Sequence, residues 1–363
     1  MELGARIPIN SSGSPTLKRV VFHPISGKTV VLWSDSADGG KLKVNLVTGE
    51  TVSGTFDSGY SLGTSGFPRY HWQAVYNPAT GNIVVLLVND TVYTFITVTI
   101  TSEGVTFSTW QSINTERHDY FVSMACTPSG EIVVAVPSLL SPWNGRAWVW
   151  QEVGDGTFGH GAEVVFESDR LDGGAQAVYD PSSGRVAIAY TKYTNTPAFV
   201  VAGLASGYTL TFGTPVAMSG NGAAYRSFGL GPSGLVMTVS AYAGNKIFPV
   251  TITDLIVTKG ADVERTWDYK SAYFANGGGN LVALYLGYGD LLYFIGLSSE
   301  FVADGPQLVD DTYDVNFGQN IIYEPTTGRF LMLYGQGAQI YLRATIAAIP
   351  LFWTNFIGQT EIA

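Results

Sequence analysis

The sequence predicts an all-β fold: a seven-bladed β-propeller of four-stranded antiparallel blades, with the ring closed by the N-terminal strand. Three observations support this prediction. A hairpin phrase recurs seven times, its spacing matches the size of one blade, and an outer-strand phrase is repeated at the N-terminus. No segment of ten or more residues keeps a clean helical period, which argues against a mainly helical chain.

The hairpin phrase is clearest over residues 178–190, Val-Tyr-Asp-Pro-Ser-Ser-Gly-Arg-Val-Ala-Ile-Ala-Tyr. A strand ends in an aromatic residue, and the turn that follows has proline at its second position and glycine where φ must be positive. A second strand of small and branched residues comes next. Similar copies occur at 21–32, 75–85 and 322–332, and degenerate copies at 126–130, 230–234 and 274–279.

The spacing of these turns sets the repeat length. Successive turn glycines are about 50 residues apart, and four short strands with their connections need roughly 40 to 50 residues. Seven units of this size fill the 363 residues of the chain. The marker glycines are Gly27, Gly81, Gly130, Gly184, Gly234, Gly279 and Gly328.

The N-terminus predicts how the ring closes. Residues 3–13 resemble residues 212–220, which form the outer strand of the fourth repeat. We therefore expect residues 3–10 to complete the last blade, whose three inner strands come from 317–346, because propellers commonly close one blade with strands from both chain ends.

This closure divides the chain into a propeller at residues 1–346 and a C-terminal exit segment at residues 347–363. The exit segment is densely apolar but too short to cross a bilayer, so we expect it to pack on another subunit or domain. Alternatively, it is the fourth strand of the last blade. The side chains expected to drive assembly are Leu351, Phe352, Trp353, Phe356 and Ile357.

Composition argues against several partners. The net charge is −10 and no run of lysine or arginine occurs, which disfavours nucleic acid. No apolar stretch of 18 residues is present, so membrane insertion is not expected, and the first residues lack the pattern of a signal peptide. The single Cys126 excludes a disulfide framework and a thiolate metal site.

Catalytic and metal-binding motifs are missing from the sequence. The four histidines lack zinc-ligand spacing, and neither a phosphate loop nor a nucleophile elbow occurs, so we expect no enzyme, no metal and no cofactor. Two acidic clusters could hold Ca²⁺ through oxygen ligands, but solvated loops are the favoured interpretation because neither shows a loop-ligand pattern. These clusters are Glu167, Asp169 and Asp172, and Asp310, Asp311 and Asp314.

The connections from each fourth strand to the next first strand are the expected binding face. Long loops on a rigid scaffold commonly carry binding residues, and aromatic and arginine side chains suit sugars or protein hot spots. The alternative is that these aromatic residues pack the blades. The candidate binding residues are Arg69, Tyr70, His71, Arg117, His118, Asp119, Tyr225, Arg226, Trp267 and Asp268.

The phrase Tyr-Asp-Pro-x-x-Gly-x-Val at 179–186, with Thr-Phe-Gly at 157–159 and 211–213, resembles repeat-rich β-propeller virion and tail-associated proteins of tailed bacteriophages. Residues 354–358 resemble the segment that leads from such propellers into a further β-rich module.

This resemblance implies a non-catalytic structural or receptor-binding component on the exterior of a virion, as a tail fibre, tail-associated or capsid-attached protein. Its partners would be other virion subunits, in a homo-oligomer within the assembly, and a bacterial surface glycan or protein receptor. The alternative is a carbohydrate-binding lectin or a glycan-active propeller enzyme that acts on a bacterial surface. Acidic residues converging at the mouth of the central channel would favour the enzyme.

Overall fold

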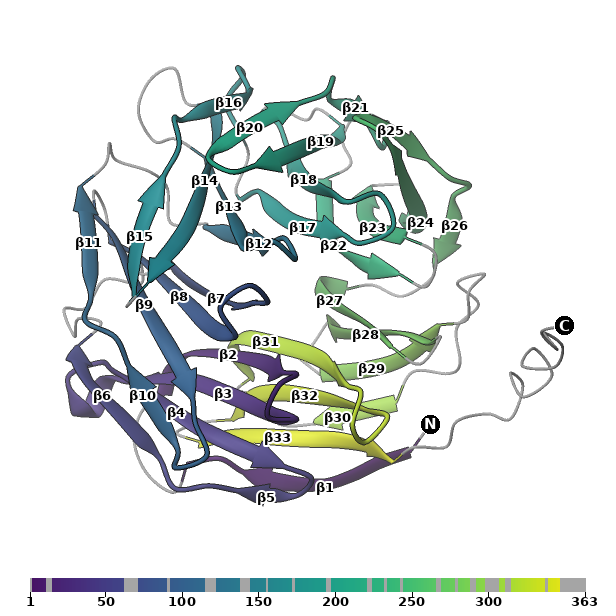
Figure 1. Cartoon of the computed structure of the whole chain (residues 1–363). Coiled ribbons are helices and arrows are strands. Elements are labelled where there is room, and N and C mark those ends of the chain that lie inside the picture. Colours follow the sequence, from purple (N-terminus) through teal and green to yellow (C-terminus); the bar gives the residue numbers. More distant parts are fainter. Residues whose placement is uncertain are drawn as a thin grey trace, which may run out of the picture.

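The computed structural model describes residues 2–10, 15–61, 71–89, 92–114, 122–137, 144–154, 156–171, 174–193, 197–220, 224–231, 234–241, 244–265, 269–277, 280–287, 292–297, 307–310, 315–336 and 339–346. Within these residues the strands form seven antiparallel sheets around a common centre (Figure 1). We call them blades 1 to 7 in the order of their hairpins along the chain.

The first four blades contain five strands each. Blade 1 contains β2 (Pro15–His23), β3 (Lys28–Asp35), β4 (Lys41–Thr48), β5 (Thr51–Val52) and β6 (Phe56–Ser61), with the 3₁₀ turn η1 (Ser36–Asp38) between β3 and β4. Blade 2 contains β7 (His71–Asn77), β8 (Asn82–Asn89), β9 (Val92–Ile100), β10 (Val105–Phe107) and β11 (Gln111–Asn114). Blade 3 contains β12 (Ser123–Cys126), β13 (Glu131–Pro137), β14 (Gly145–Gly154), β15 (Thr157–His160) and β16 (Val164–Glu167). Blade 4 contains β17 (Gln176–Asp180), β18 (Arg185–Thr191), β19 (Ala198–Ser206), β20 (Thr209–Phe212) and β21 (Val216–Ala217).

The last three blades differ in strand number. Blade 5 contains β22 (Ala224–Gly231), β23 (Gly234–Ala241), β24 (Gly244–Thr253), β25 (Ile256–Lys259) and β26 (Val263–Arg265). Blade 6 contains β27 (Tyr269–Gly277), β28 (Asn280–Gly287), β29 (Leu292–Leu297) and β30 (Gln307–Asp310). Blade 7 contains β31 (Val315–Glu324), β32 (Arg329–Gln336), β33 (Gln339–Ile346) and β1 (Glu2–Pro8).

The first strand of each hairpin lies innermost, and the innermost strands of neighbouring blades contact one another around the whole ring, from β2 through β7, β12, β17, β22 and β27 to β31 and back to β2. Apolar side chains fill the space between adjacent sheets. Between blades 1 and 2, for example, Leu32 and Val44 pack in one cluster with Val85 and Ile96. The core is therefore divided into layers between blades, because each sheet is too small to bury its faces alone.

The hairpin turns owe their shape to glycine and to a buried polar residue that precedes the turn. Gly184 has φ 69°, a left-handed conformation that glycine adopts without the strain of a Cβ. Before the turn, the buried Asp180 accepts hydrogen bonds from the Ser182 amide at 3.1 Å and the Ser183 hydroxyl at 2.6 Å. In blade 1 this place is taken by His23, whose Nε2 donates to the Gly81 carbonyl of blade 2 at 2.7 Å.

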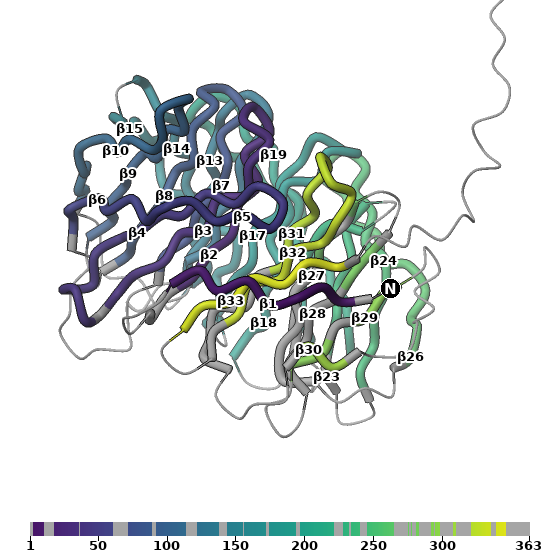
Figure 2. Tube along the Cα trace, turned by 90° about the horizontal axis from the view of Figure 1, so that it is seen from below, coloured from purple at the N-terminus to yellow at the C-terminus, as the bar shows by residue number. Residues whose placement is uncertain are grey.

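The predicted closure by the N-terminal strand is confirmed. Strand β1 pairs antiparallel with β33, with Glu2 opposite Ile346 and Pro8 opposite Tyr341, and the two strands run side by side in Figure 2. The amide of Ile340 also donates to Asn10 Oδ1 at 2.6 Å. Residues 347–363, including Leu351, Phe352, Trp353, Phe356 and Ile357, lie outside the described residues, so their assembly role stays a prediction.

The prediction of four strands in every blade is wrong for blades 1 to 5. In these blades the outer strand is broken by three residues into two pieces, both of which pair with the third strand. The first residue of each break is Ser or Gly, namely Ser53, Ser108, Gly161, Gly213 and Gly260. Because the second piece is a strand, the connections to the next blade begin later than the sequence suggested.

Serine and glycine shape the break in different ways. The Ser108 hydroxyl accepts a hydrogen bond from the Thr97 amide at 2.9 Å, so it replaces the backbone carbonyl that a regular ladder would offer. At Gly161 a Cβ would overlap the carbonyl oxygen of Tyr208, which belongs to the turn between β19 and β20 in the next blade. Glycine at this place lets adjacent blades approach each other closely.

Candidate functional site

The residues predicted to form the binding face are only partly within the described structure. His71 begins β7, where it lies opposite Val88, and Tyr225 lies in β22 opposite Val239, with Arg226 at an irregularity of the same ladder. These three positions are therefore in innermost strands and not in the connecting loops. The remaining candidates, Arg69, Tyr70, Arg117, His118, Asp119, Trp267 and Asp268, lie outside the described residues.

A groove lies between blades 3 and 4 in the described part of the chain. It has a volume of about 460 Å³ and is lined by residues of β16 in blade 3 and by residues of β19 and of the segments next to β18 and β21 in blade 4. We call it the Lys192 groove. It is lined by Val165, Phe166, Glu167, Ser168, Lys192, Phe199 and Pro215.

One ammonium group organises the polar side of this groove. Lys192 Nζ lies 2.9 Å from Glu167 Oε2 and 3.0 Å from Asp169 Oδ2, so it joins the two blades. Glu167 is also held by the Tyr190 hydroxyl at 2.8 Å and by the Asp169 amide at 3.0 Å. A buried carboxylate with several donors is tolerated because these bonds replace its lost hydration.

An aromatic stack lies beneath this ion pair. Phe199 stands opposite Tyr190 in the ladder of blade 4, and their rings are stacked with centroids 5.7 Å apart. Lys192 Nζ lies 4.7 Å from the centroid of the Phe199 ring. Nearby, the Arg170 guanidinium lies 3.8 Å from the ring centroid of the half-exposed Tyr193. The groove thus combines apolar surface with hydrogen-bonding groups of both charges.

The protonation states in the groove follow from these contacts. Burial lowers the pKa of Lys192, but the hydrogen bonds to Glu167 and Asp169 and their negative charges raise it more, and the pKa lies above its ordinary value. Burial and the nearby charge of Glu167 raise the pKa of Tyr190. Lys192 is therefore a cation and Tyr190 a neutral hydrogen-bond donor at neutral pH.

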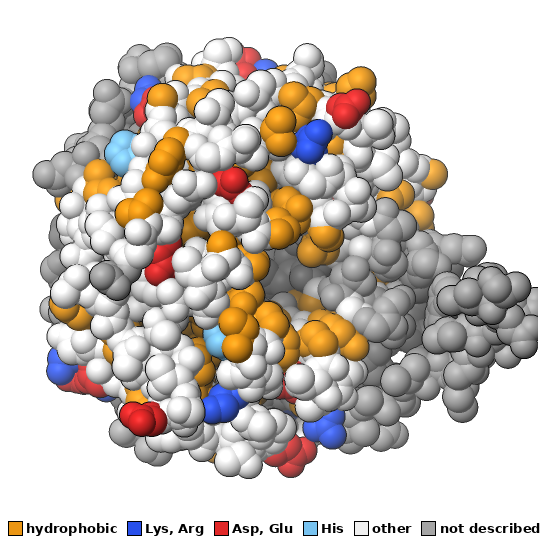
Figure 3. Space-filling model, in the orientation of Figure 1, with side chains coloured by type: hydrophobic (Ala, Val, Ile, Leu, Met, Phe, Trp, Pro, Cys, Tyr) orange, Lys and Arg blue, Asp and Glu red, His pale blue; other side chains and the backbone are white. Residues whose placement is uncertain are grey.

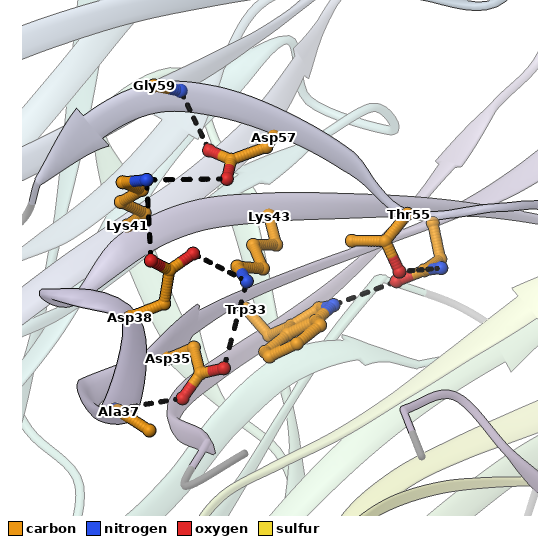
Figure 4. A network of polar contacts seen from close by, with 10 residues as sticks. Trp33, Asp35, Ala37, Asp38, Lys41, Lys43, Thr55, Asp57 and Gly59 are labelled. Atoms are coloured by element: carbon orange, nitrogen blue, oxygen red, sulfur yellow. Dashed lines mark hydrogen bonds and ion pairs between the residues drawn. The ribbon is translucent and has the colours of Figure 1, made fainter. Parts of the chain in front are cut away.

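Blade 1 carries a related but more exposed network at the same end of its second and third strands (Figure 4). Lys43 Nζ lies 2.8 Å from Asp38 Oδ2 and 5.5 Å from the centroid of the Trp33 ring. Lys41 Nζ bridges Asp38 at 3.3 Å and Asp57 at 3.8 Å. The lysine hydrogen bonds hold the pKa of Asp38 below its ordinary value.

The acidic clusters considered as Ca²⁺ sites have a different role where they are described. Glu167 is buried and neutralised by Lys192, so the expectation of a solvated loop is wrong for it, whereas Asp169 is exposed. Asp172, Asp311 and Asp314 lie outside the described residues. Among the residues that the structure describes, no three His, Cys, Asp or Glu side chains come together to hold a metal.

The sequence did not suggest Lys192 as a site residue, nor that Glu167 is buried and paired with it. A signal was available, because Lys192 stands eight residues after Gly184, as Asp35 stands eight after Gly27, at the end of the second strand. Both positions carry charges that pair with residues on neighbouring strands. Repeat alignment by the turn glycine would have placed these side chains at the same end of their blades.

Comparisons with known proteins support the fold and leave the activity open. No protein-family model and no curated protein matches the chain. The BP39L lectin from Burkholderia pseudomallei matches with a TM-score of 0.61 at 8% identity, over 93% of this chain and 97% of that chain. The polysaccharide lyase Uly1 matches with a TM-score of 0.59 at 11% identity, over 95% of this chain and 99% of that one.

A third match is an oligogalacturonate lyase in complex with manganese, with a TM-score of 0.55 at 12% identity, over 96% of this chain and 99% of that one. Together with the sheets arranged in a ring, these matches define the chain as a β-propeller protein. At such low identity they show the fold alone. No helix of the described residues is long and apolar enough to span a membrane.

Proposed function

We propose that this protein is a non-catalytic carbohydrate-binding propeller that holds a neutral, hydroxyl-rich saccharide in the Lys192 groove. The observation that carries the proposal is the pairing of apolar surface, from Val165, Phe199 and Pro215, with the Glu167 and Lys192 charges in one open groove. Sugars present C–H faces and hydroxyl groups together, so such mixed surfaces suit them.

The charge balance favours a neutral ligand. The Lys192 cation is shared by two carboxylates, so the groove has no surplus positive charge to attract a uronate or sulfate. The chain itself carries a net charge of −10, and the charged side chains on the face shown in Figure 3 are scattered over its described part. An acidic polysaccharide would be repelled by this field.

The absence of catalysis is part of the proposal. Glycoside hydrolysis requires two carboxyl groups with different protonation states on either side of the scissile bond. Glu167 and Asp169 instead share one ammonium group. Two of the structural neighbours are named as lyases, so the proposal needs a direct test for turnover.

The test is a glycan array that contains both neutral and uronate-rich oligosaccharides, followed by calorimetry on the neutral glycans that bind. Lys192→Ala should weaken binding by about tenfold or more, since it removes a charged hydrogen-bond donor. Val165→Glu, at a side chain that is 46% exposed, should weaken binding similarly without touching the buried network.

Lys246→Ala in blade 5 is the matched control, because Lys246 also pairs with an aspartate, Asp262, at 3.1 Å but lies outside the groove. Its affinity should equal that of the parent protein. If the Lys192 and Val165 variants bind as tightly as the parent protein, or if only uronate-rich glycans bind, the proposal is contradicted. A rise in ultraviolet absorbance from newly formed unsaturated sugars on incubation with polysaccharide would show a lyase instead.

A role on a bacteriophage particle remains a second proposal, which rests on the blade phrase at 179–186 and its resemblance to virion propellers. In that setting a saccharide of the bacterial surface would be the receptor. The three structural neighbours described above are named as a lectin and two lyases, and none of these names refers to a virion. Immunogold labelling of purified particles would test the proposal, and unlabelled particles would contradict it.

A further inference from the structure

The junction between blades 1 and 2 repeats the architecture of the Lys192 groove with different side chains. Trp110 directly precedes β11, just as Pro215 directly precedes β21, and each follows the break residue of its outer strand by two positions. Trp110 therefore occupies the repeat position of Pro215, which lines the groove between blades 3 and 4.

The other wall of this junction is also equivalent. Strand β6 pairs with β4 in blade 1 as β16 pairs with β14 in blade 3, and each ladder has a shift near its end. Tyr60 lies near the end of β6, where blade 3 has Glu167 and Ser168. At the junction between blades 1 and 2, an aromatic ring therefore stands where the Lys192 groove has its polar wall.

Tyr60 and Trp110 contact each other across the two blades. Their ring centroids are 5.2 Å apart with an interplanar angle of 60°, which is an edge-to-face arrangement. Tyr60 is 37% exposed, and Trp110 is partly exposed beside it. Trp110 packs with its buried part against the apolar cluster between blades 1 and 2, and its exposed part lies beside Tyr60 as apolar surface at the junction.

The indole N–H of Trp110 is a hydrogen-bond donor without an acceptor among the described residues. It is buried and makes no hydrogen bond within the described structure. The indole nitrogens of Trp72 and Trp150 share this condition, but both of those side chains are almost fully buried, whereas Trp110 reaches the surface. A buried donor without a partner destabilises the protein, so an acceptor supplied by a ligand would be favourable.

Charged groups lie on the same outer strand as Tyr60. Asp57 Oδ1 accepts from the Gly59 amide at 2.8 Å, and its Oδ2 lies 3.8 Å from Lys41 Nζ. Gly59 has φ 73°, and it turns the chain between Asp57 and Tyr60. Figure 4 shows Asp57 between Lys41 and Gly59 in the blade 1 network, and the side chains of Asp57 and Lys41 are partly exposed.

We infer that Tyr60 and Trp110 form a second saccharide site, in which the C–H face of a neutral pyranose packs on the aromatic pair and a sugar hydroxyl oxygen accepts the Trp110 indole N–H. The inference rests on the proposed function, and it makes the propeller at least bivalent for its glycan. Because the indole nitrogen is buried in the unbound structure, this site requires the Tyr60 ring to move when the sugar binds.

Indole NMR tests this site directly. In protein labelled with ¹⁵N at tryptophan, the Trp110 resonance is assigned by its loss in Trp110→Phe. The methyl glycosides of glucose, galactose, mannose and fucose are then titrated into the parent protein and into Lys192→Ala. At least one should shift the Trp110 resonance saturably in both proteins, because the second site does not need Lys192.

Immobilised glycan separates the two sites further. Trp110→Phe, which keeps a smaller aromatic ring but removes the donor, should weaken binding to a dense glycan surface by about tenfold, because one of two linked contacts is lost. Tyr179→Phe is a control at a ring outside this junction. If glycans bind but the Trp110 resonance and the Trp110→Phe affinity stay unchanged, the second site is wrong while the Lys192 groove stands. If no glycan binds at all, both proposals fall.

Discussion

The Lys192 groove and the Tyr60–Trp110 junction are built from the same backbone but differ in chemistry. Both lie where the second piece of one broken outer strand meets the next blade. In the first, Glu167 and Pro215 line the space, and in the second Tyr60 and Trp110 take their places. The comparison teaches that a repeat can keep its scaffold while a few rim positions set the polarity of each junction.

The largest expected effect tests whether the two types of strand break are interchangeable. Gly161→Ser gives blade 3 the residue that blades 1 and 2 use, but the added side chain overlaps the Tyr208 carbonyl. We expect a loss of about 2–3 kcal/mol in the free energy of unfolding, because backbone must move. Denaturant titration measures this loss.

Gly54→Ser is the control for this substitution. Gly54 lies in the corresponding break of blade 1, and a Cβ there would meet no atom within 4 Å. Its free energy of unfolding should change by less than about 0.5 kcal/mol. Equal stability of the two variants would show that the close approach of blades 3 and 4 does not depend on glycine.

A smaller effect is expected from the donor beneath the charged groove. Tyr190→Phe removes the hydroxyl that donates to Glu167, and the carboxylate is too buried for water to replace it fully. The free energy of unfolding should fall by about 1–2 kcal/mol. Tyr179→Phe, at a hydroxyl without a hydrogen bond in the described structure, should change it much less. If Tyr179→Phe lowered the free energy of unfolding more than Tyr190→Phe, the Tyr190 hydroxyl would not be needed to stabilise Glu167.

The smallest effect concerns pH. The pKa of Lys192 is raised in the folded protein above the ordinary value of 10.5, so the folded state binds more protons than the unfolded state as pH passes this value. The stabilisation by Lys192 is therefore complete below about pH 10 and is lost at higher pH. At pH 8 the free energy of unfolding of the parent protein should exceed that of Lys192→Met by about 1 kcal/mol, and this difference should fade above pH 10.5.

Denaturant titrations of both proteins from pH 8 to pH 11.5 measure this difference, in which other titrating groups cancel. Lys41→Ala is the matched control, because Lys41 also joins two carboxylates but is 35% exposed. Surface pairs contribute little, so its effect should be near zero throughout. A constant difference between the parent and Lys192→Met would contradict the assigned pKa direction.

The hairpins and the closing strand could be predicted because their signals are local. A proline and a glycine at fixed places specify a turn such as Asp180–Gly184, and β1 copies an outer-strand phrase. The strand breaks were missed because Ser108 and Gly161 look like ordinary loop residues. Their effect depends on a third-strand amide or on the next blade, which a pattern within one repeat does not contain.

The candidate sites were harder to predict for the same reason. Lys192 and Glu167 lie in different blades, and so do Tyr60 and Trp110. Each side chain alone suggests only a surface lysine, a loop acid or a packing aromatic. His71, Tyr225 and Arg226 were predicted because aromatic and arginine side chains are common in binding sites. The groove instead contains residues such as Lys192 and Pro215, which stand at fixed positions of the repeat.

The pairing of β1 with β33 has a consequence for the order of events on the ribosome. Glu2 is synthesised before its partner Ile346, which lies more than 300 residues further along the chain. At synthesis rates of about 5–20 residues per second, the N-terminal strand waits roughly 20–70 s for its neighbour. During that time its Leu3 and Ile7 side chains and its backbone edge are without their final cover, so among the described strands this one waits longest for its partner and is exposed meanwhile to chaperones and to other nascent copies.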